Sequence, residues 1–495
     1  MIMDASTPPN GTVRTWLEYR AEDDGVAFTF PDGDGDLTWS ELRDQAKIIA
    51  AGLVAKGIVK SESIAIVYPN CREAILAIYG VLYGGFRATM INLVAGNDAI
   101  SYALEHSQAR VAFVHDSAVK LFDQANDGTI EKLELTFDKS HSEIYELMPE
   151  DDALLMYTSG TTGRPKGVVH SQASLLAGGW TTAIAHQLSA QDRGFCVLPV
   201  YHINGLCVTV MGALVSGGSI SMCSRFSASK FWQNAEASKV TWFSIVPTIV
   251  SHLLHGQNEP SMQTRSRIRF GRSASSALAP DVQSAFEKRF GIPIVETMGL
   301  TETAAQILSN PLPPAVRKIG SPGIAYGNDI AVFDENFEPC ECNVEGEIVV
   351  RGPNVMKEYL KNRKATRDSF AGDWLRTGDL GRMDEDGYIF VTGRLKELII
   401  KGGENIAPRE IDEALYSHPD VVEAAAFSVK CDRYGETVEA AVKLSEGSQV
   451  VEGVLQDICQ QKLGDFKRPD RVHILQELPK GPSGKIQRAK IALML

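Results

Sequence analysis

Short apolar runs alternate with longer amphipathic segments through about the first 310 residues of the chain. Residues 63–67 and 111–114 are almost wholly apolar, as is typical of buried strands, whereas residues 39–56 and 72–84 have the length and apolar spacing of helices. The rhythm continues at three later apolar runs, residues 195–198, 240–243 and 292–295. Strands that alternate with helices in this way predict an α/β fold of layered sheets.

The pattern of apolar runs changes beyond about residue 320. Short strand-like runs separated by Gly and Asp, such as 347–350 and 388–391, predict a small β-rich subdomain. The last hundred residues predict a compact α+β unit with helices at 409–416 and 452–463 and strands at 423–429 and 439–444. Because 495 residues are too many for one core, we expect two domains, residues 1–395 and 396–495.

Charge and apolar content exclude some classes of function. The net charge of −13 argues against a general nucleic-acid binder or a protein attracted to anionic membranes. Residues 194–224 contain no Asp, Glu, Lys or Arg, but Pro199 and several glycines break the run, so it predicts a buried strand, a turn and a buried helix without membrane insertion. The N-terminus has no basic segment followed by an apolar one, which predicts a cytoplasmic protein.

A loop rich in Gly and Thr, YTSGTTGRPKG at residues 157–167, follows a buried strand and precedes an expected helix at 173–178. Strand, Gly-rich loop and helix together are typical of a phosphate-binding arrangement. A Walker loop requires Gly-x-x-x-x-Gly-Lys-Ser/Thr, and counting from Gly160 the second Gly position holds Pro165. The sequence therefore predicts ATP chemistry of another kind.

Four further motifs follow this loop in a fixed order. They are TMGLTE (297–302), WLRTGD (374–379), GRLKE (393–397) and PSGK (482–485). With them the chain, from LTWSEL (37–42) to Lys485, resembles the adenylate-forming superfamily, which includes acyl-CoA synthetases, peptide-synthetase adenylation domains and luciferases. The stretches RFSASKFW, RSASSALAP, NPLP and KGGENIAP look similar to oxalate–CoA ligases and their small-acid relatives.

The resemblance implies a two-step reaction. A carboxylate attacks the α-phosphate of ATP to give an acyl-adenylate and pyrophosphate, and the thiol of coenzyme A then displaces AMP. Negative charge accumulates on phosphate or carbonyl oxygens in each step, so preorganised cations and hydrogen-bond donors should dominate catalysis. ATP, Mg²⁺ and coenzyme A are the implied cofactors.

A nucleotide site is implied across several segments. Its expected residues are Thr158, Ser159, Gly160, Thr161, Thr162, Gly163, Lys166, Ser275, Ser276, Ala277, Met298, Asp379 and Arg394. Asp379 would accept hydrogen bonds from both ribose hydroxyls, and Arg394 would meet the ribose or a phosphate. Met298 departs from the pattern, because many relatives have an aromatic residue there, but a thioether can still pack on adenine.

Catalytic roles are implied for Lys485, Thr301, Glu302 and His202. Glu302, with Thr301 beside it, would hold Mg²⁺, which prefers carboxylate and phosphate oxygens. Lys485 would reach between the acyl oxygen and the α-phosphate, where charge develops. His202 would lie at the acyl pocket, although a histidine of the core is an alternative.

The two half-reactions share one pocket and need different walls. The resemblance implies that the C-terminal domain is mobile, with a hinge near Lys396. It would present Lys485 first and then turn Lys401, Gly402 and Gly403 toward the thiol, the paired glycines leaving room for a pantetheine arm.

The acid is predicted to lack an α-ammonium group, since His202, Ile203 and Asn204 stand where amino-acid-activating relatives place an Asp. The oxalate branch carries a His shortly after its Thr-Glu, and here Gln306 and its neighbours offer none. We therefore rank short monocarboxylic or hydroxy acids first, oxalate-like diacids second and long fatty acids third.

The expected function is an AMP-forming acid–CoA ligase acting on a small to medium acid, as a monomer or homodimer. Two alternatives remain at this stage: a stand-alone enzyme that loads a carrier-protein thiol, and a non-catalytic nucleotide binder. An inactive binder would be expected to lose Glu302 or Lys485, and both are present.

Overall fold

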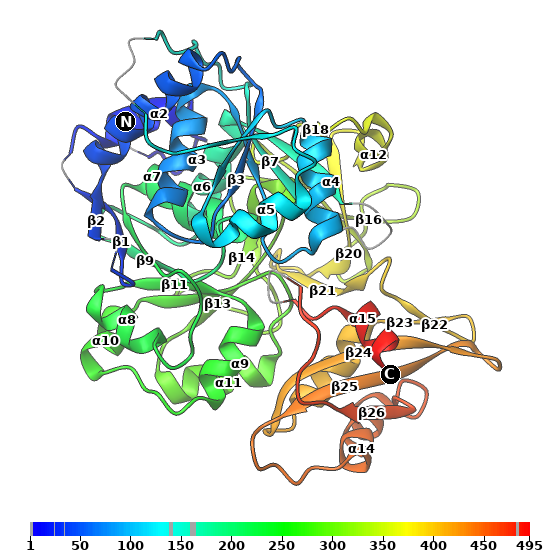
Figure 1. The fold of residues 1–495 in the computed structure, drawn as a ribbon. Helices are drawn as coiled ribbons and strands as arrows, with labels where there is room; N and C mark the ends of the chain where they lie inside the picture. Colours follow the sequence, from blue (N-terminus) through cyan, green and yellow to red (C-terminus); the bar gives the residue numbers. More distant parts are fainter. Residues whose placement is uncertain (1–2, 24, 34, 138–141, 159–164, 482–484) are drawn as a thin grey trace.

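The computed structural model describes residues 3–23, 25–33, 35–137, 142–158, 165–481 and 485–495. Over these residues the chain forms an N-terminal lobe built on two mainly parallel sheets, a smaller antiparallel sheet, and a C-terminal lobe with a sheet of its own (Figure 1). This is the mixed α/β architecture that the sequence predicts.

The first large sheet is parallel over its central part. Across the described residues its strands run in the order β15 (Ile324–Ala325), β14 (Ala305–Ser309), β13 (Ile294–Leu300), β12 (Phe270–Ser273), β11 (Trp242–Ile245), β9 (Arg193–Cys196), β10 (Ser219–Met222), β1 (Val26–Phe30) and β2 (Gly35–Thr38). Strands β13 through β1 are parallel, and β14, β15 and β2 pair antiparallel at the two ends.

The second large sheet repeats this plan. Its order is β18 (Glu358–Tyr359), β8 (Lys166–Ser171), β7 (Asp152–Thr158), β4 (Arg87–Met90), β3 (Ser63–Val67), β5 (Val111–Val114) and β6 (Glu131–Leu133). Strands β7 through β6 are parallel, whereas β8 and β18 are antiparallel. The last strand, β18, comes from far along the chain and so joins the later part of the N-terminal lobe to the loop that follows β7.

Helices cover both sheets. In chain order they are α1 (Val13–Arg20), α2 (Trp39–Ala55), α3 (Arg72–Gly84), α4 (Asn97–Ser107), α5 (Val119–Ala125), α6 (Gln172–Ala185), the π-helical η2 (Asn204–Met211), α7 (Gly212–Ser216), α8 (Phe231–Ala237), α9 (Pro247–His255), α10 (Met262–Arg267), α11 (Pro280–Phe290) and α12 (Arg363–Asp368), with short 3₁₀ turns η1 (Asp116–Ala118) and η3 (Thr301–Thr303). Helix α2 begins where it does because the Thr38 hydroxyl accepts from the Glu41 amide while the Glu41 carboxylate accepts from the Thr38 amide.

One continuous apolar core joins the two large sheets. It includes Phe28 and Trp242 of the first sheet, Ile64 and Leu154 of the second, and Leu176 of α6, all with at most 2% of their surface exposed. Burial of this kind contributes about 25 cal/mol for each Å² of apolar surface removed from water, so the two sheets form one stable scaffold.

The sequence between residues 194 and 224 begins with the predicted buried strand, turn and buried helix, and the helix is π-helical from Asn204 to Met211. The prediction missed the strand that follows, β10. The described residues contain no helix whose length and apolarity would let it cross a bilayer.

One local prediction was wrong. The Gly-rich loop does not lead from a strand into a helix; it leads from β7 into β8, and these strands pair antiparallel with Thr158 opposite Lys166. The cause is the run that follows Lys166, where Val168 and Val169 favour a strand and pack into the core between β7 and β18. Helix α6 starts only at Gln172, one strand later than the phosphate-binding arrangement requires.

The antiparallel sheet and the C-terminal lobe complete the chain. The former has β16 (Asp329–Phe333), β17 (Gly346–Arg351), β20 (Trp374–Met383) and β19 (Phe370–Ala371), with β21 (Ile389–Arg394) paired to β20. The latter has β23 (Glu404–Ile406), β22 (Ile399–Lys401), β25 (Gly435–Leu444), β24 (Val421–Cys431) and β26 (Arg471–Ile474), covered by α13 (Pro408–Tyr416), α14 (Glu452–Leu463) and α15 (Arg488–Met494).

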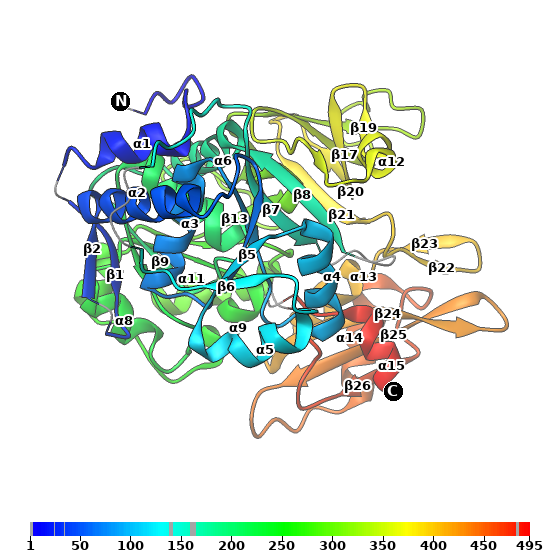
Figure 2. The same cartoon turned by 45° about the horizontal axis from the view of Figure 1, so that its top comes forward.

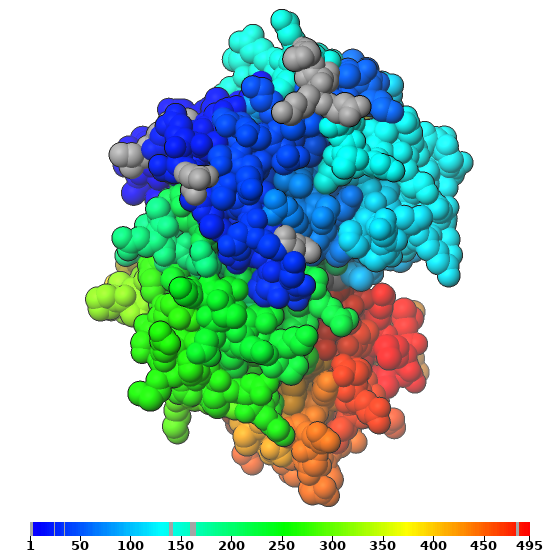
Figure 3. All heavy atoms as spheres, turned by 60° about the vertical axis from the view of Figure 1, so that its left-hand side comes forward, coloured from blue at the N-terminus to red at the C-terminus, as the bar shows by residue number. Residues whose placement is uncertain are grey.

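The C-terminal lobe lies against the segment that carries α9 (Figure 3). The hydroxyl of Ser251 donates to the Val422 carbonyl at 2.6 Å, and His252 Nε2 lies 3.0 Å from the Glu423 carboxylate. Polar contacts of this kind are common where domains move relative to one another, as this lobe is expected to do. The division at residue 396 and the hinge there stay predictions.

The backbone of the TMGLTE motif leaves no room for a side chain at Gly299. In place of its hydrogen, a methyl group would overlap the Ala305 carbonyl across the β13–β14 hairpin. We expect Gly299→Ala to lower the free energy of unfolding by about 1–3 kcal/mol or more, as overpacking does. Urea denaturation measures this. Gly453, in α14, has open space around it, so Gly453→Ala is the matched control and should leave stability unchanged or raise it by about 0.5–1 kcal/mol; equal effects would contradict the account.

Candidate active site

Loops that leave the carboxyl ends of parallel strands carry most of the predicted site residues. Strand β13 leads into Thr301 and Glu302, β12 into Ser275, and β9 into the turn that holds His202. In an open α/β sheet, ligands bind outside the carboxyl ends of the strands. Thr158 ends β7 of the second sheet, so both sheets deliver loops to the candidate site.

Glu302 is held in place by Tyr359. The Tyr359 hydroxyl donates to Glu302 Oε1 at 2.7 Å, and the Lys166 ammonium lies 4.2 Å from the centre of the Tyr359 ring. Oε2 of Glu302 accepts no hydrogen bond from the described residues. The predicted phosphate-binding lysine and the predicted metal-binding carboxylate are thus joined by one aromatic side chain, and an oxygen of the carboxylate is left for a ligand.

A hydrogen bond from His170 anchors the turn that carries Glu302. His170 Nε2 donates to the Thr301 carbonyl at 2.7 Å, and its Nδ1 faces the Ser174 hydroxyl at 3.1 Å. Burial lowers the pKa of His170 to about 4, so the ring is neutral at physiological pH and keeps this bonding pattern. Ala304, just after the turn, takes a left-handed conformation with φ of 45°.

Four charged side chains meet where the two lobes join. Arg394 Nε donates to Asp379 Oδ1 at 2.7 Å, because β20 and β21 place these residues opposite one another. Glu397, three residues further, lies 3.4 Å from the Lys485 ammonium. The structure therefore brings three motifs of the sequence, TGD, GRLKE and PSGK, together. Their side chains form a row of alternating charge, called the charge chain below: Asp379, Arg394, Glu397 and Lys485.

Neighbouring charges favour the ionised forms of Arg394 and Glu397. Burial lowers the pKa of Arg394, but the Asp379 carboxylate and the fields of Glu397 and Glu302 outweigh it and raise the pKa overall. Burial raises the pKa of Glu397, yet Lys485, Arg488 and Arg394 together bring it below its ordinary value. Glu302 is among the carboxylates that raise the pKa of Arg394, which is consistent with one candidate site.

The predicted acyl-side residues are less tightly grouped. His202 closes a turn with Pro199 and packs edge-on against Tyr201, with ring centres 5.1 Å apart. Ser275 has φ of 76° and accepts a hydrogen bond from Asn204 Nδ2 at 3.2 Å. Ser276 and Ala277 follow it near the surface, and Met298 packs partly buried beside the antiparallel sheet.

Lys401, Gly402 and Gly403 lie apart from these residues. The Lys401 ammonium donates to the Phe466 carbonyl at 2.9 Å within the C-terminal lobe, and both glycines have positive φ in the turn between β22 and β23. Figures 1 and 2 both show this hairpin projecting away from the N-terminal lobe. Lys485, and not the hairpin, is therefore directed at the candidate site.

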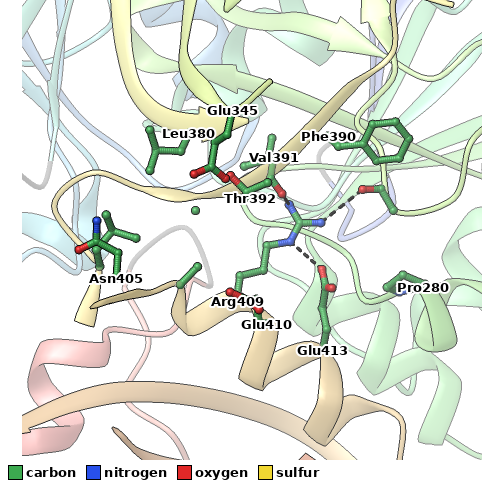
Figure 4. Close-up of a pocket in the computed structure, with 14 residues that line it drawn as sticks. Pro280, Glu345, Leu380, Phe390, Val391, Thr392, Asn405, Arg409, Glu410 and Glu413 are labelled. Carbon is green, nitrogen blue, oxygen red and sulfur yellow. Dashed lines mark hydrogen bonds and ion pairs between the residues drawn. The ribbon is translucent and has the colours of Figure 1, made fainter. Parts of the chain in front are cut away.

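A cleft of about 430 Å³ separates the lobes beside the charge chain (Figure 4). Its lining includes Thr392 of β21, Asn405 of β23 and Glu413 of α13. Arg409 crosses it, donating to the Val391 carbonyl at 2.6 Å and to Glu413 at 2.6 Å. The cleft is thus an opening next to the expected hinge.

Part of the predicted phosphate loop, Ser159, Gly160, Thr161, Thr162 and Gly163, lies outside the described residues.

The sequence analysis missed two residues that contribute to the candidate site, Tyr359 and Glu397. Glu397 could have been found as the acidic end of GRLKE. Tyr359 carries no local signal, because only the pairing of β18 with β8 brings it to Glu302.

Comparison with known proteins places this geometry in a family. A family described as "AMP-binding enzyme" matches residues 17–360, and one described as "AMP-binding enzyme C-terminal domain" matches residues 410–485. A sulfoacetate–CoA ligase of Cupriavidus necator is 41% identical over 99% of this chain and 99% of its own length. An oxalate–CoA ligase of Arabidopsis thaliana is 35% identical over 95% of this chain and 97% of its own.

Solved structures agree with the fold. The o-succinylbenzoate CoA synthetase of Bacillus subtilis, in complex with its acyl-adenylate intermediate, superposes with a TM-score of 0.86 at 29% identity over 98% of both chains. The same protein in complex with ATP and magnesium ion gives a TM-score of 0.84 at 29% identity, covering 96% of this chain and 98% of that one.

Tyr359 offers a test of how Glu302 is positioned. Tyr359→Phe removes the hydroxyl and keeps the ring beneath Lys166, so the carboxylate loses its orientation. We expect the Mg²⁺ concentration for half-maximal ATP turnover to rise roughly 10–100-fold, the usual effect of losing a partner of a metal ligand. A Mg²⁺ titration of the rate measures this.

Tyr388 is the matched control. It too lies under a lysine, Lys318, at 4.5 Å, and its hydroxyl donates to the Val316 carbonyl at 2.6 Å. Tyr388→Phe should leave the Mg²⁺ titration unchanged. A titration that Tyr359→Phe does not move would show that the hydroxyl has no positioning role.

Proposed function

The chain belongs to the AMP-binding enzyme family, and on that premise we propose that it is an acid–CoA ligase. The carboxylate oxygen of a small to medium acid forms a bond to the α-phosphorus of ATP as pyrophosphate leaves. The sulfur of coenzyme A then bonds to the acyl carbon, the bond to AMP breaks, and the thiol proton is released. The matched relatives act on small acids by name, and a small acid without an α-ammonium group is the substrate class proposed here.

A single observation carries the proposal. The Lys485 ammonium, from the far end of the chain, lies 3.4 Å from Glu397 and so beside the Asp379–Arg394 pair. Lysine and arginine at this point would stabilise charge on phosphate and carbonyl oxygens in a partly buried site. The fold does not require a lysine from the far end of the chain at this point. A reaction that builds negative charge on phosphate and carbonyl oxygens does require a cation there.

The donor set also fits Mg²⁺. Glu302 presents a hard carboxylate oxygen whose partner oxygen is fixed by Tyr359, and phosphate oxygens would complete such a site. When bound, the ion neutralises phosphate charge and so favours attack at phosphorus. Lys166 adds a second positive charge close by, and Asp379 provides two acceptor oxygens for adjacent ribose hydroxyls.

Glu397 has a positioning role in this proposal. It holds the Lys485 ammonium near the site before nucleotide arrives, and phosphate oxygens then compete for the same donor. Rotation about Lys396 would withdraw Lys485 and bring Lys401, Gly402 and Gly403 toward the thiol. A cytoplasmic location belongs to the proposal, since both ATP and coenzyme A are needed.

Pyrophosphate exchange tests the reaction class. With ³²P-labelled pyrophosphate, label should enter ATP only when a suitable carboxylic acid and Mg²⁺ are both present. AMP release should then require coenzyme A. Exchange without any acid, or hydrolysis to ADP and phosphate, would contradict adenylation. AMP release with a carrier protein and none with coenzyme A would favour the carrier-loading alternative.

Lys485→Ala separates the two half-reactions. Loss of a donor to the transition state should slow adenylation by roughly 10²–10³-fold or more. Conversion of a supplied acyl-adenylate and coenzyme A to thioester should stay within about threefold of the wild-type rate. Lys490→Ala, an exposed lysine on α15, is the matched control and should alter neither step. Equal losses in both steps would argue against alternation of the C-terminal lobe.

A further inference from the structure

Arg272 is an arginine buried inside the N-terminal lobe without an acidic partner. Only 1% of its surface is exposed, and it ranks among the largest fully buried side chains of the described residues. Its Nε donates to Gln306 Oε1 at 3.1 Å, and its Nη1 donates to Asn204 Oδ1 at 2.7 Å and to Ser244 Oγ at 3.1 Å. All three acceptors are neutral, and no described carboxylate forms an ion pair with it.

This isolation is unusual, because a buried charge is costly unless it is paired. The other buried or half-buried arginines of the site region have carboxylates: Arg394 has Asp379, and Arg488 has Asp412. Burial lowers the pKa of Arg272 to about 9, which still leaves it charged at neutral pH. Burial and the Arg272 charge bring the pKa of the neighbouring His186 ring far below its usual value, so this ring is neutral beside Arg272.

The surroundings of Arg272 are the segments predicted to hold the acid. Arg272 lies on β12, three residues before Ser275; Asn204 lies just after His202; and Gln306 follows the Thr301–Glu302 turn. Three stretches far apart in the sequence therefore converge on one buried guanidinium at the acyl side of the candidate site.

Arg272 also fixes the orientation of Asn204. The Asn204 carbonyl oxygen accepts from both Arg272 and Ser244, so its amide nitrogen must face the other way. That nitrogen donates to Ser275 Oγ at 3.2 Å, and an amide nitrogen has two hydrogens to donate. Among the described residues the second N–H of this amide has no acceptor, and the Arg272 charge lies on the other side of the amide.

We propose that Arg272 and Asn204 form a subsite for a second anionic group on the acid substrate. The distal group lies against the Asn204 amide and the Ser275 hydroxyl, and the Arg272 guanidinium is its counter-charge. The substrate class is a short acid with a carboxylate at one end and a carboxylate or sulfonate at the other. This inference rests on the proposed function and reverses the ranking made from sequence, which placed monocarboxylic acids first.

The physical argument concerns the charge balance around the buried Arg272 guanidinium. Opposite charges attract strongly where water is excluded, since the effective dielectric constant is far below that of water. A neutral distal group would leave Arg272 uncompensated, and an ammonium group would repel it. Discrimination should therefore be large, as it is in sites whose polar groups are left unpaired by the wrong substrate.

Two pairs of probe acids of similar size test the charge of the distal group, which is negative in one member of each pair and neutral in the other. Sulfoacetate is compared with methylsulfonylacetate, and succinate with succinamate. In the wild type, kcat/KM should favour the charged member of at least one pair by about 10²-fold or more. The second readout needs no turnover: the charged acid should raise the melting temperature of the protein, and its neutral partner should not.

Two variants remove the counter-charge by opposite means. Arg272→Met deletes it, and Asn204→Asp neutralises it by pairing, so the second stays informative should the first fail to fold. Both should bring the charged-to-neutral ratio of kcat/KM below about tenfold and abolish the selective thermal shift. The control is Arg269→Met, on the same segment, whose partner is Asp192 at 2.5 Å; it should keep the wild-type ratio.

The outcomes separate this inference from the proposed function. A wild-type protein that shows no preference for the charged acid in rate or in thermal shift overturns the subsite. So does a preference that survives in both variants. A selective thermal shift that both variants lose, without turnover of any acid, supports the subsite and overturns the ligase proposal instead.

Discussion

Parallel pairing of strands is the constraint on which the site depends. Because β9, β11, β12 and β13 run in the same direction, the segments after them emerge at one edge, and three of these segments supply His202 and Asn204, Ser275, and Glu302. The second sheet contributes through the β7–β8 hairpin and the late strand β18, which brings Tyr359 to Glu302. That pairing puts one tyrosine between Lys166 and Glu302.

Charge compensation is the second common thread. The protein has a net charge of −13, yet its candidate site gathers Lys166, Arg394 and Lys485. Arg394 and Lys485 face a carboxylate, and Lys166 lies over an aromatic ring, so the site tolerates its positive charge before any phosphate is present. Arg272 is the exception, and its neutral surroundings are what point to an anionic part of the substrate.

Much of the fold was predictable because its signals are local. Strands at 63–67 and 111–114 and helices at 72–84 and 452–463 have the predicted bounds, since apolar periodicity and turn residues mark them. The hairpin between β7 and β8 was missed because the β-branched run at Val168 and Val169 is short and one of the two strands that flank it, β18, is distant in sequence. Arg272 stood at the head of a quoted motif, RSASSALAP, but a charge within a strand gains meaning only once its burial and partners are known.

The central claim is that a carboxylate of the acid attacks the α-phosphate at this site. Turnover with an acid whose carboxylate carries ¹⁸O, followed by mass spectrometry of the products, tests it directly. The account predicts one ¹⁸O atom in AMP and none in pyrophosphate, because the carboxylate oxygen that bonds to phosphorus leaves with AMP. Label in pyrophosphate or phosphate, or AMP without label, would contradict it.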